Sequence, residues 1–344
     1  MEFDLMTGAG TWADTAEFAR LLEANGFSGM LFTETAEVPW MKIAAAATAA
    51  PTLHFSTGIA VAFPRSPMIS AAVAWEMAHN TGGRFRLGLG SQVKGHVVRR
   101  YSAEFKPAAA RLRDYVAAVK ACLRAFRGDE PLAHDGPFYQ LNYLPAAWSP
   151  PRHEFDDIKV DISAVGPLMT RVAGEVADGV HVHPLHSMHY LEHRLLPGVA
   201  AGATAAGRDP GAIELVIPVF AVPGDTPEER AALVQRARSQ IAFYGSTPNY
   251  AFQFDDLGFD GSTARLGALI RQGKFDEMAA AITDEMLEHF AVVCRWDELA
   301  DRLIQRYSGT ASRLVMYLAE ESIRRDPTAA GRWGEVARAV RTAR

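Results

Sequence analysis

The sequence predicts a closed (β/α)8 barrel of the TIM type, formed by a single domain over residues 1–344. Short apolar runs alternate with longer amphipathic segments, a pattern typical of βαβ units and a parallel sheet. Eight such units follow one another, which favours a closed barrel over an open sheet. The turn after the first strand (TGAGTW, residues 7–12) lacks the third glycine of GxGxxG, so an open dinucleotide-binding sheet is disfavoured.

The first half of the chain alternates regularly between strands and helices. We expect strands at 3–6, 28–33, 53–62 and 85–89, and helices at 11–25, 39–50, 67–80 and 108–126. The run LHFSTGIAVA at 53–62 is almost wholly apolar, as a strand buried on both faces should be. Gly26 suits the end of the first helix, and Pro39 is tolerated in the first turn of the second.

The second half interrupts this rhythm twice. Residues 127–157 are rich in Pro, Gly and aromatic residues, with a hairpin expected at Asp135-Gly136, and residues 245–260 are also irregular. We place both segments at the barrel mouth, where long loops usually shape a pocket. Their aromatic residues favour an apolar or ring-containing substrate, or else anchor the loops or form dimer contacts. The remaining strands are expected at 158–165, 179–183, 214–222 and 313–318, with helices at 169–176, 190–206 and 227–244, further helices up to 290, and a last helix after 326.

Composition restricts the class of protein. Hydrophobic residues make up 49% and charged residues 22%, which is ordinary for a soluble globular enzyme. The net charge of −5 and the lack of a long basic run argue against nucleic acid as a main partner. Cys122 and Cys294 form no CxxC pair, so we expect reduced thiols. There is no signal-peptide pattern, and the alanine-rich run 43–50 is too short to span a bilayer, so a cytoplasmic protein without membrane contact is expected.

The active site of such a barrel lies at the carboxyl ends of its strands. Glu34 follows the second strand and is a candidate general acid or base, although it also suits the start of a helix before Pro39. Trp40 offers a flat apolar wall for a ring system, or a packing residue. His183 lies at the mouth after the sixth strand, as a hydrogen-bond donor, a proton relay or a structural histidine. Because no HExxH motif and no acidic residue accompany the histidines there, we expect no metal.

Two loops have the composition of an anion site. Gly90 and Ser91 end the fourth strand with unhindered backbone N–H groups, and a basic segment follows, which indicates either a phosphate cradle or a solvated helix. After the fifth strand, Ala164 to Gly166 are small and Pro167 suits the first turn of a helix. The N–H groups and dipole of that helix would attract a phosphate, although an ordinary turn fits the same residues.

Several segments together resemble a known family. LHFSTGIAVAFPRSP, the helix after it and GGRFRLGLGSQ are similar to the stretch shared by luciferase-like monooxygenases and deazaflavin-dependent reductases. AVGPLMTRVAGEVADGVHVHP resembles the matching cofactor-phosphate segment and sixth strand. QIAFYGSTPNY and DEMLEHFAVV resemble the coenzyme F420-dependent subgroup. The resemblance runs from the first strand to the eighth, so it covers nearly the whole chain.

This resemblance implies a luciferase-like TIM barrel that pairs as a homodimer. It also implies a non-proline cis peptide near Gly58-Ile59, where a bulge supports the central ring of the cofactor, with Ser91 and Gln92 beside the ring or ribityl chain. The cofactor-binding set implied is Trp40, Gly58, Ile59, Gly90, Ser91, Gln92, Ala164, Val165, Gly166, Pro167 and Met169, the last five against the phosphate.

The chain departs from the sugar-phosphate dehydrogenases of the same superfamily. Where those enzymes resemble this chain they carry an Asp-His pair and a Glu, and here Thr35, Ala36 and Val93 stand in those places. We therefore expect hydride transfer between deazaflavin coenzyme F420 and another small organic substrate, with Glu34 and His183 as catalytic residues. An FMN-dependent monooxygenase is the alternative, and a non-catalytic flavin-binding barrel is a third possibility.

Overall fold

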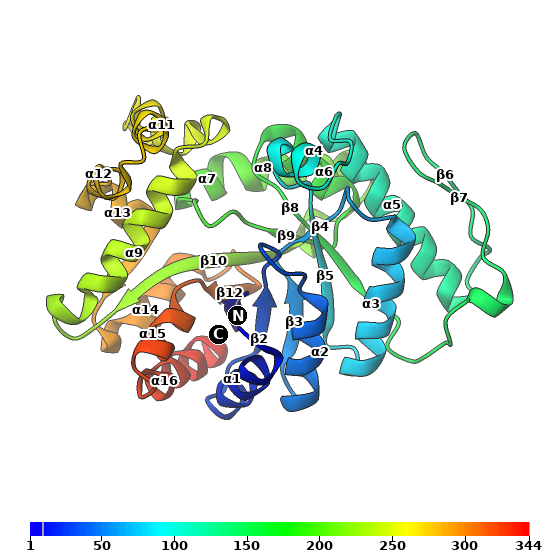
Figure 1. Ribbon diagram of the computed structural model, residues 1–344, viewed down its shortest axis with the longest axis horizontal. Helices are drawn as coiled ribbons and strands as arrows, with labels where there is room; N and C mark the ends of the chain where they lie inside the picture. The colour runs from blue at the N-terminus through cyan, green and yellow to red at the C-terminus, as the bar shows by residue number, and fades with distance from the viewer. Residues whose placement is uncertain (9, 344) are drawn as a thin grey trace.

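The computed structural model describes residues 1–8 and 10–343, which form a closed parallel β-barrel wrapped by helices (Figure 1). The barrel strands are β1 (Glu2–Thr7), β2 (Gly29–Phe32), β3 (His54–Thr57), β4 (Ala60–Val61), β5 (Phe85–Gly90), β8 (Lys159–Ser163), β9 (Gly179–His181), β10 (Glu214–Pro223) and β12 (Arg313–Met316). Pairing runs from β12 through β1, β2, β3, β5, β8 and β9 to β10, and β10 pairs back with β12. Since β4 continues β3, the nine segments form eight barrel strands. This closed eight-stranded barrel confirms the predicted fold.

Long helices cover the outside of the barrel between consecutive strands. They are α1 (Trp12–Ala24), α2 (Trp40–Ala49), α3 (Pro67–Thr81), α5 (Ala108–Arg127), α6 (Pro167–Val176), α8 (Leu196–Ala205), α9 (Pro227–Gly245), α14 (Trp296–Tyr307) and α16 (Ala329–Thr342). Shorter helical segments are α4 (Lys94–Arg99), η1 (Ala146–Trp148), α7 (Met188–Tyr190), η2 (Leu191–Leu195), η3 (Pro210–Ala212), η4 (Pro248–Tyr250), α10 (Phe252–Asp255), α11 (Ser262–Arg271), α12 (Phe275–Ala280), α13 (Asp284–Phe290) and α15 (Ala319–Arg325).

Local sequence explains where several helices begin and end. Thr11 and Asp14 form a capping box at the start of α1, each side chain accepting from the other's backbone N–H. The backbone N–H groups of Thr11 and Asp14 therefore already have partners within the chain and are not free to bind an anion. Ser66 caps α3 ahead of Pro67, and Gly82 ends that helix with a φ of 60°, in the left-handed region that favours glycine.

Two strands differ from their prediction. The single strand expected at 53–62 is interrupted after Thr57, and the peptide bond between Gly58 and Ile59 is cis, as the family resemblance implied. An unpredicted strand, β11 (Ala291–Cys294), pairs with the last residues of β10 outside the barrel. The strand β10 has ten residues and extends beyond its barrel neighbours, so its end offers a free edge on which β11 can form.

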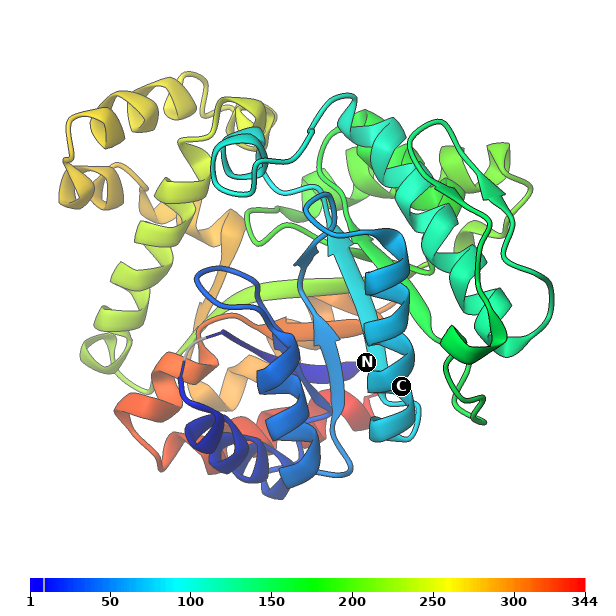
Figure 2. The same cartoon turned by 45° about the vertical axis from the view of Figure 1, so that its right-hand side comes forward.

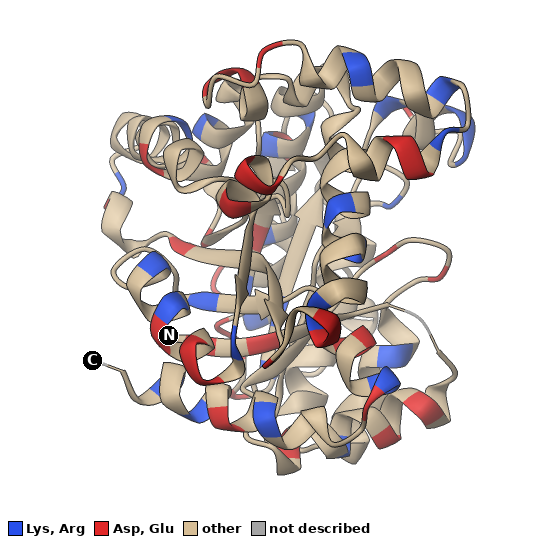
Figure 3. Ribbon diagram, turned by 90° about the vertical axis from the view of Figure 1, so that its left-hand side faces the viewer, with Lys and Arg blue, Asp and Glu red and all other residues tan. Residues whose placement is uncertain are grey.

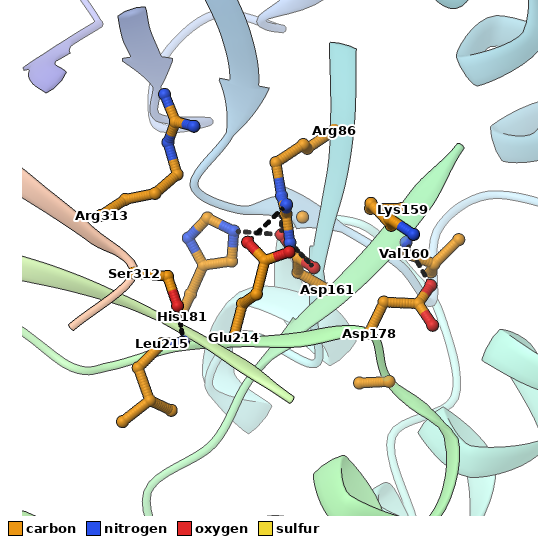
Figure 4. Close-up of polar contacts among 12 residues, drawn as sticks. Arg86, Lys159, Val160, Asp161, Asp178, His181, Glu214, Leu215, Ser312 and Arg313 are labelled. Atoms are coloured by element: carbon orange, nitrogen blue, oxygen red, sulfur yellow. Dashed lines mark hydrogen bonds and ion pairs between the residues drawn. The ribbon is translucent and has the colours of Figure 1, made fainter. Parts of the chain in front are cut away.

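Buried ion pairs cross the interior near the amino ends of the strands (Figure 4). Arg86 on β5 binds Asp161 on β8 through two hydrogen bonds of 2.8 and 2.9 Å and Glu214 on β10 at 2.8 Å. Arg313 on β12 binds Asp4 on β1 in the same bidentate way, at 2.6 and 2.8 Å. Burial alone would raise the pKa of Asp161, but His181, whose Nε2 lies 3.5 Å from the carboxylate, and the Arg86 cation outweigh it and leave that pKa well below its ordinary value.

The first insertion packs against the helices on the outside of the barrel. Its hairpin, β6 (His134–Asp135) and β7 (Gln140–Leu141), runs along the outer side of α5 (Figure 2). The buried carboxylate of Asp114 on α5 accepts hydrogen bonds of 2.8 and 3.0 Å from the N–H groups of Phe138 and Tyr139. Further along, the indole N–H of Trp75 donates to Pro151 on the same outer side. Residues 127–157 therefore pack on the outside of the helical layer, against α3 and α5.

The second irregular segment, 245–260, contacts the barrel mouth. Tyr250 in η4 packs against His183, with ring centroids 4.6 Å apart. Phe252 in α10 lies 5.7 Å from the Tyr190 ring. The exposed pair of Arg194 with Asp256 fastens this segment to η2. The segment thus lies over the loop that follows β9.

Over the described part of the chain, no helix is both long enough and apolar enough to cross a membrane. Cys122 and Cys294 are both buried, and burial raises the pKa of their thiols to about 12 and about 11. Basic and acidic segments are interspersed on the side of the molecule that Figure 3 shows.

Candidate active site at the carboxyl rim

Three of the predicted cofactor loops meet at the carboxyl rim of the barrel. Gly90 ends β5, and a Cβ added there would lie 2.6 Å from the Ser163 hydroxyl and 2.7 Å from the Ile59 side chain. Glycine is therefore required at this position by close packing. The contact places the Gly58–Ile59 interruption, the end of β5 and the end of β8 side by side.

The loop after β5 adopts an unusual backbone conformation. Gln92 has a φ of 55°, which is uncommon for a residue other than glycine. Its side-chain oxygen accepts from the N–H of Val93 at 2.9 Å, and the Ser91 hydroxyl donates to its carbonyl at 3.3 Å. These local hydrogen bonds hold Ser91 and Gln92 above the end of β5, next to the loops already described.

The basic segment after this loop forms α4. Lys94, His96 and Arg99 are exposed, and the Arg100 guanidinium donates to the carbonyl of Thr35 at 2.5 Å. Arg100 therefore ties α4 to the loop between β2 and α2. This arrangement fits a solvated basic helix better than a phosphate cradle.

The amino end of α6 is open. Gly166 is the N-cap and provides no side chain, and a Cβ added to it would meet nothing within 4 Å. The first helical hydrogen bond runs from Thr170 N–H to the Gly166 carbonyl, so the N–H groups of Leu168 and Met169 precede the helical ladder. Leu168 is 71% exposed, so this end of the helix faces solvent. Such a terminus attracts anions through its free donors and its dipole.

A buried tyrosine fixes the loop before this helix. The hydroxyl of Tyr190 donates a hydrogen bond of 2.8 Å to the carbonyl of Val165. Tyr190 is 1% exposed, so its ring has little freedom to move. Ala164, which precedes Val165, is itself buried. The approach to α6 is therefore held from the side of the next helical segment.

Glu34 is buried and already occupied. Its carboxylate pairs with both terminal nitrogens of Arg65, at 2.5 and 2.8 Å, and accepts from the N–H of Val61 at 2.8 Å. Arg65 also donates to the Val61 carbonyl at 2.8 Å and lies over the Trp40 ring, 5.8 Å from its centroid. A carboxylate with these partners holds β4 against β2, which favours a positioning role over the acid–base role expected from sequence.

His183 follows β9 on the rim. Ser163 and His181 are the last paired residues of β8 and β9, and Val165 and His183 each follow two residues later. Its Nδ1 accepts from the Leu185 N–H at 3.1 Å, which leaves the proton of the neutral ring on Nε2. Burial lowers the pKa of His183 to about 4, so the ring is neutral near pH 7.

The other histidines near the end of β9, His181, His186 and His189, each have different neighbours. His181 points into the barrel, where its Nε2 lies 3.5 Å from Asp161 (Figure 4). His186 is buried, and its Nδ1 lies 2.9 Å from the His183 carbonyl. His189 stacks on His193 at the surface. In residues 1–8 and 10–343, no group of three or more His, Cys, Asp or Glu side chains is placed to hold a metal ion.

A hollow of about 850 Å³ opens between the loops after β1 and β2. Trp12, Val38 and Met41 line it and are 62%, 41% and 50% exposed. The hollow is open to solvent and lies apart from His183 and α6.

Comparison with known proteins agrees with this geometry. The model of the luciferase-like monooxygenase family matches residues 1–313. The chain belongs to this family. A 37% identical relative is the uncharacterised protein Rv1360 of Mycobacterium tuberculosis, with a match over 88% of this chain and 89% of that protein. The 5,10-methylenetetrahydromethanopterin reductase of Methanolobus tindarius is 24% identical over 84% of this chain and 85% of the reductase.

Solved structures show the same luciferase-like fold. The coenzyme F420-dependent tetrahydromethanopterin reductase of Methanopyrus kandleri superposes with a TM-score of 0.77 at 18% identity, covering 97% of each chain. The oxygenating constituent of 3,6-diketocamphane monooxygenase from Pseudomonas putida, in complex with FMN, gives 0.66 at 17% identity, over 99% of this chain and 97% of that one. The family supports an oxidoreductase, and its members include F420- and FMN-dependent enzymes.

Sequence reasoning assigned no role to three residues that hold the rim loops in place. Arg65 is a charge directly after an apolar strand, and that position was a usable signal. Tyr190 had no signal, because its role depends on a contact with Val165, 25 residues away. His186 was noted only as one of several histidines, and its backbone contact could not be read from spacing.

Proposed function

We propose that the chain is an oxidoreductase that transfers a hydride between deazaflavin coenzyme F420 and a small organic substrate. The observation that carries this proposal is the open amino end of α6, which follows β8 on the rim, as His183 follows the neighbouring strand β9. The family supports a flavin-type cofactor, and a cofactor of that type brings a phosphate. The side chains at this end of α6 leave room for that anion.

The residues present fit such a cofactor. The N–H groups of Leu168 and Met169 would bind the phosphate, with Tyr190 holding the loop at Val165 in place. The interrupted strand at Ile59 and the end of β5 at Gly90 would support the ring. When bound, a deazaflavin supplies a hydride at its C5.

The catalytic roles follow from what each side chain is free to do. His183 would contact the substrate, because its Nε2–H is the donor left after Nδ1 accepts from Leu185. Glu34 would act through Arg65 and Val61 by fixing β4, because its oxygens are already bound. We therefore propose His183 as the catalytic residue and Glu34 as a positioning residue.

The choice of F420 rests on relatives of this chain and is tested by binding. The purified protein is titrated with F420 and, separately, with FMN, and fluorescence quenching is followed. We expect micromolar binding of F420 and much weaker binding of FMN. The variant G166A should weaken binding about tenfold, because a methyl group would fill the space before α6.

The other outcomes separate the alternatives. Binding of FMN without F420 would overturn the cofactor choice and favour an FMN-dependent monooxygenase. Tight binding of either cofactor, without turnover against a broad panel of carbonyl compounds and alcohols, would favour a non-catalytic flavin-binding barrel. Binding that G166A leaves unchanged would remove α6 from the cofactor site.

We also propose that the chain works in the cytoplasm as a homodimer, with neither nucleic acid nor membrane as a partner. The exposed apolar side chains Trp12, Val38 and Met41 support pairing between copies, because contiguous apolar surface favours association. Sedimentation equilibrium should give twice the monomer mass. A monomer at micromolar concentration would contradict the pairing.

A further inference from the structure

We propose that His183 binds the oxygen of an uncharged carbonyl compound, or of the matching alcohol, as a neutral hydrogen-bond donor. This inference rests on the proposed function and names the substrate class of the same site. It comes from three observations: the fixed tautomer of the ring, the absence of charge around it, and the two aromatic rings that enclose it.

The loop after β9 fixes the orientation of the His183 ring. The Leu185 N–H donates to Nδ1 at 3.1 Å, so Nε2 carries the proton of the neutral ring. His186 holds the same loop from below, with its Nδ1 2.9 Å from the His183 carbonyl. The phenol of Tyr307 lies 3.4 Å from the other nitrogen of His186, so this second ring is also fixed. The donor is thus preorganised before any substrate binds.

Among the described residues, no ionised side chain acts on His183 that could neutralise a charged substrate. Burial lowers the pKa of His183 and outweighs the contact with the Leu185 N–H, which acts in the opposite direction; no ionised side chain contributes among the described residues. The same holds for Tyr250, whose pKa is raised by burial alone. A carboxylate or phosphate on the substrate would lose its hydration here without gaining a counter-charge, which is costly. The reacting end of the substrate should therefore be uncharged.

Two tyrosines shape the space next to the ring. Tyr244 on α9 meets His183 edge to face with centroids 4.8 Å apart, and Tyr250 lies 4.6 Å away. The Tyr244 hydroxyl lies 2.7 Å from the Tyr317 hydroxyl, which in turn donates to the Gln240 side chain at 3.3 Å. Because the Tyr317 hydroxyl donates its only proton to Gln240, the Tyr244 hydroxyl must donate to Tyr317. This hydrogen bond fixes the Tyr244 ring beside His183. The Tyr244 hydroxyl proton is then not available to a substrate.

The reaction balances with a neutral donor. The carbonyl carbon gains a C–H bond from the hydride of reduced deazaflavin, and the C=O π electrons move to the oxygen. That oxygen would take the Nε2 proton of His183, and the ring would recover a proton from water, which the N–H proton released by the oxidised deazaflavin replaces. The ketone is reduced by two electrons and the deazaflavin is oxidised by two. A neutral imidazole that polarises a carbonyl has a precedent in the general chemistry of enzymes.

The first test measures the tautomer and charge of the His183 ring and requires no turnover. Long-range ¹H–¹⁵N spectra of the imidazoles, assigned with H183Q, should show a neutral ring protonated on Nε2 throughout about pH 5.5–8. Adding cyclohexanol or cyclohexanone to the cofactor-loaded protein should shift the His183 Nε2 signal. A ring that titrates near pH 6.5, or that carries its proton on Nδ1, would overturn the inference.

The second test uses turnover by holoenzyme. Cyclohexanone and acetophenone are compared with pyruvate and a keto-sugar phosphate, using reduced F420. We expect turnover of the uncharged ketones alone. The variant H183L should lower kcat/KM about 100-fold, because it removes the donor, whereas H183Q should lose less than about tenfold, because its amide N–H stands near the place of Nε2.

A control and the remaining outcomes complete the design. Y317F removes the partner that locks Tyr244 but touches no substrate, so it should raise KM and leave the Nε2 tautomer unchanged. Turnover of pyruvate in preference to the ketones would overturn the substrate class while leaving hydride transfer intact. Failure of F420 to bind at all would instead refute the proposed function, and this inference with it.

Discussion

The carboxylate of Glu34 and the guanidinium of Arg65 form a bidentate ion pair, at 2.5 and 2.8 Å, between the ends of β2 and β4. Both groups also bind the backbone of Val61, Glu34 through the N–H and Arg65 through the carbonyl. The pair therefore fixes the strand that follows the Gly58–Ile59 interruption. A residue that sequence reasoning treats as an acid or base is, in the folded chain, bound to its neighbours at both oxygens.

Replacement of Glu34 by Gln should destabilise the protein strongly. E34Q leaves Arg65 without its counter-charge in a site where the Arg65 side chain is 17% exposed, so we expect a loss of about 3–5 kcal/mol in the free energy of unfolding. Urea unfolding measures it. The matched control is E130Q, which removes an exposed partner of Arg124 and should cost less than about 0.5 kcal/mol. Equal effects of the two variants would show that the Glu34 pair holds nothing in place.

The ion pairs inside the barrel predict a loss of stability in acid. The pKa of Asp161 is lowered in the folded chain, so this group stabilises the fold above its unfolded pKa of about 4 and loses that effect as the pH falls further. D161N should cost about 3–5 kcal/mol at pH 7, because Arg86 keeps only Glu214. D157N, at an exposed carboxylate paired with Lys159, is the control and should change little. A wild-type chain equally stable at about pH 2.5 and 5 would contradict this assignment.

Two glycines at the rim should respond differently to alanine. At Gly166 a Cβ meets nothing within 4 Å and the backbone φ is −83°, so G166A should cost less than about 1 kcal/mol. At Gly90 a Cβ would lie 2.6 Å from Ser163, so G90A should cost about 1–3 kcal/mol through overpacking. Thermal unfolding separates the two variants. If G166A destabilised the fold as much as G90A, any loss of cofactor binding by G166A could not be assigned to the anion site.

The tyrosine that holds the α6 loop should affect binding more than folding. Y190F removes the 2.8 Å hydrogen bond to the Val165 carbonyl and keeps the buried ring, so the free energy of unfolding should fall by about 1 kcal/mol. The cofactor Kd should rise several-fold, because the loop before the open helix end is then less fixed. Y143F, on a side chain that is 80% exposed, is the control. Unchanged cofactor affinity in Y190F would detach this loop from the binding site.

The pattern of the sequence was sufficient for the barrel. All eight barrel strands lie where apolar runs predicted them, because strands buried on both faces leave a strong signal. The strand β11 was missed because AVVC follows directly after a helix and pairs with an overhang of β10 that no local pattern announces. The packing of the insertion 127–157 against α5 was not predictable, because its anchor, Asp114, lies inside a helix and forms its contacts only in the fold.

The meeting of the rim loops was predictable from the sequence, and the partners of their side chains were less so. Loops at 58–59, 90–92 and 164–166 come together, because strand ends of a parallel barrel share one rim. The ion pair of Glu34 could not be predicted from the sequence, because its partner Arg65 lies 31 residues away along the chain. In the same way, the tautomer of His183 is set by one backbone N–H in a loop of irregular shape.

Buried histidines on the same rim predict a second, distinct dependence of stability on pH. Burial lowers the pKa of His186 to about 3 and that of His183 to about 4, whereas the unfolded chain binds these protons near pH 6.5. Between those limits the unfolded state holds more protons, so stability falls as the pH drops below about 6.5, by up to about 1.4 kcal/mol per pH unit for each ring. Above pH 6.5 both histidines are neutral in the folded and in the unfolded chain, so they no longer make stability depend on pH.

Chemical unfolding at pH values between about 4.5 and 7.5 measures this slope, in a window above that of Asp161. H186Q should make the slope shallower, because one neutral buried ring no longer resists protonation. H96Q, at an exposed position in α4, should leave it unchanged. A slope that H186Q does not alter would mean that His186 takes up its proton in the folded chain. The loop that orients His183 would then carry a positive charge beneath the substrate position, and the neutral donor would lose its physical basis.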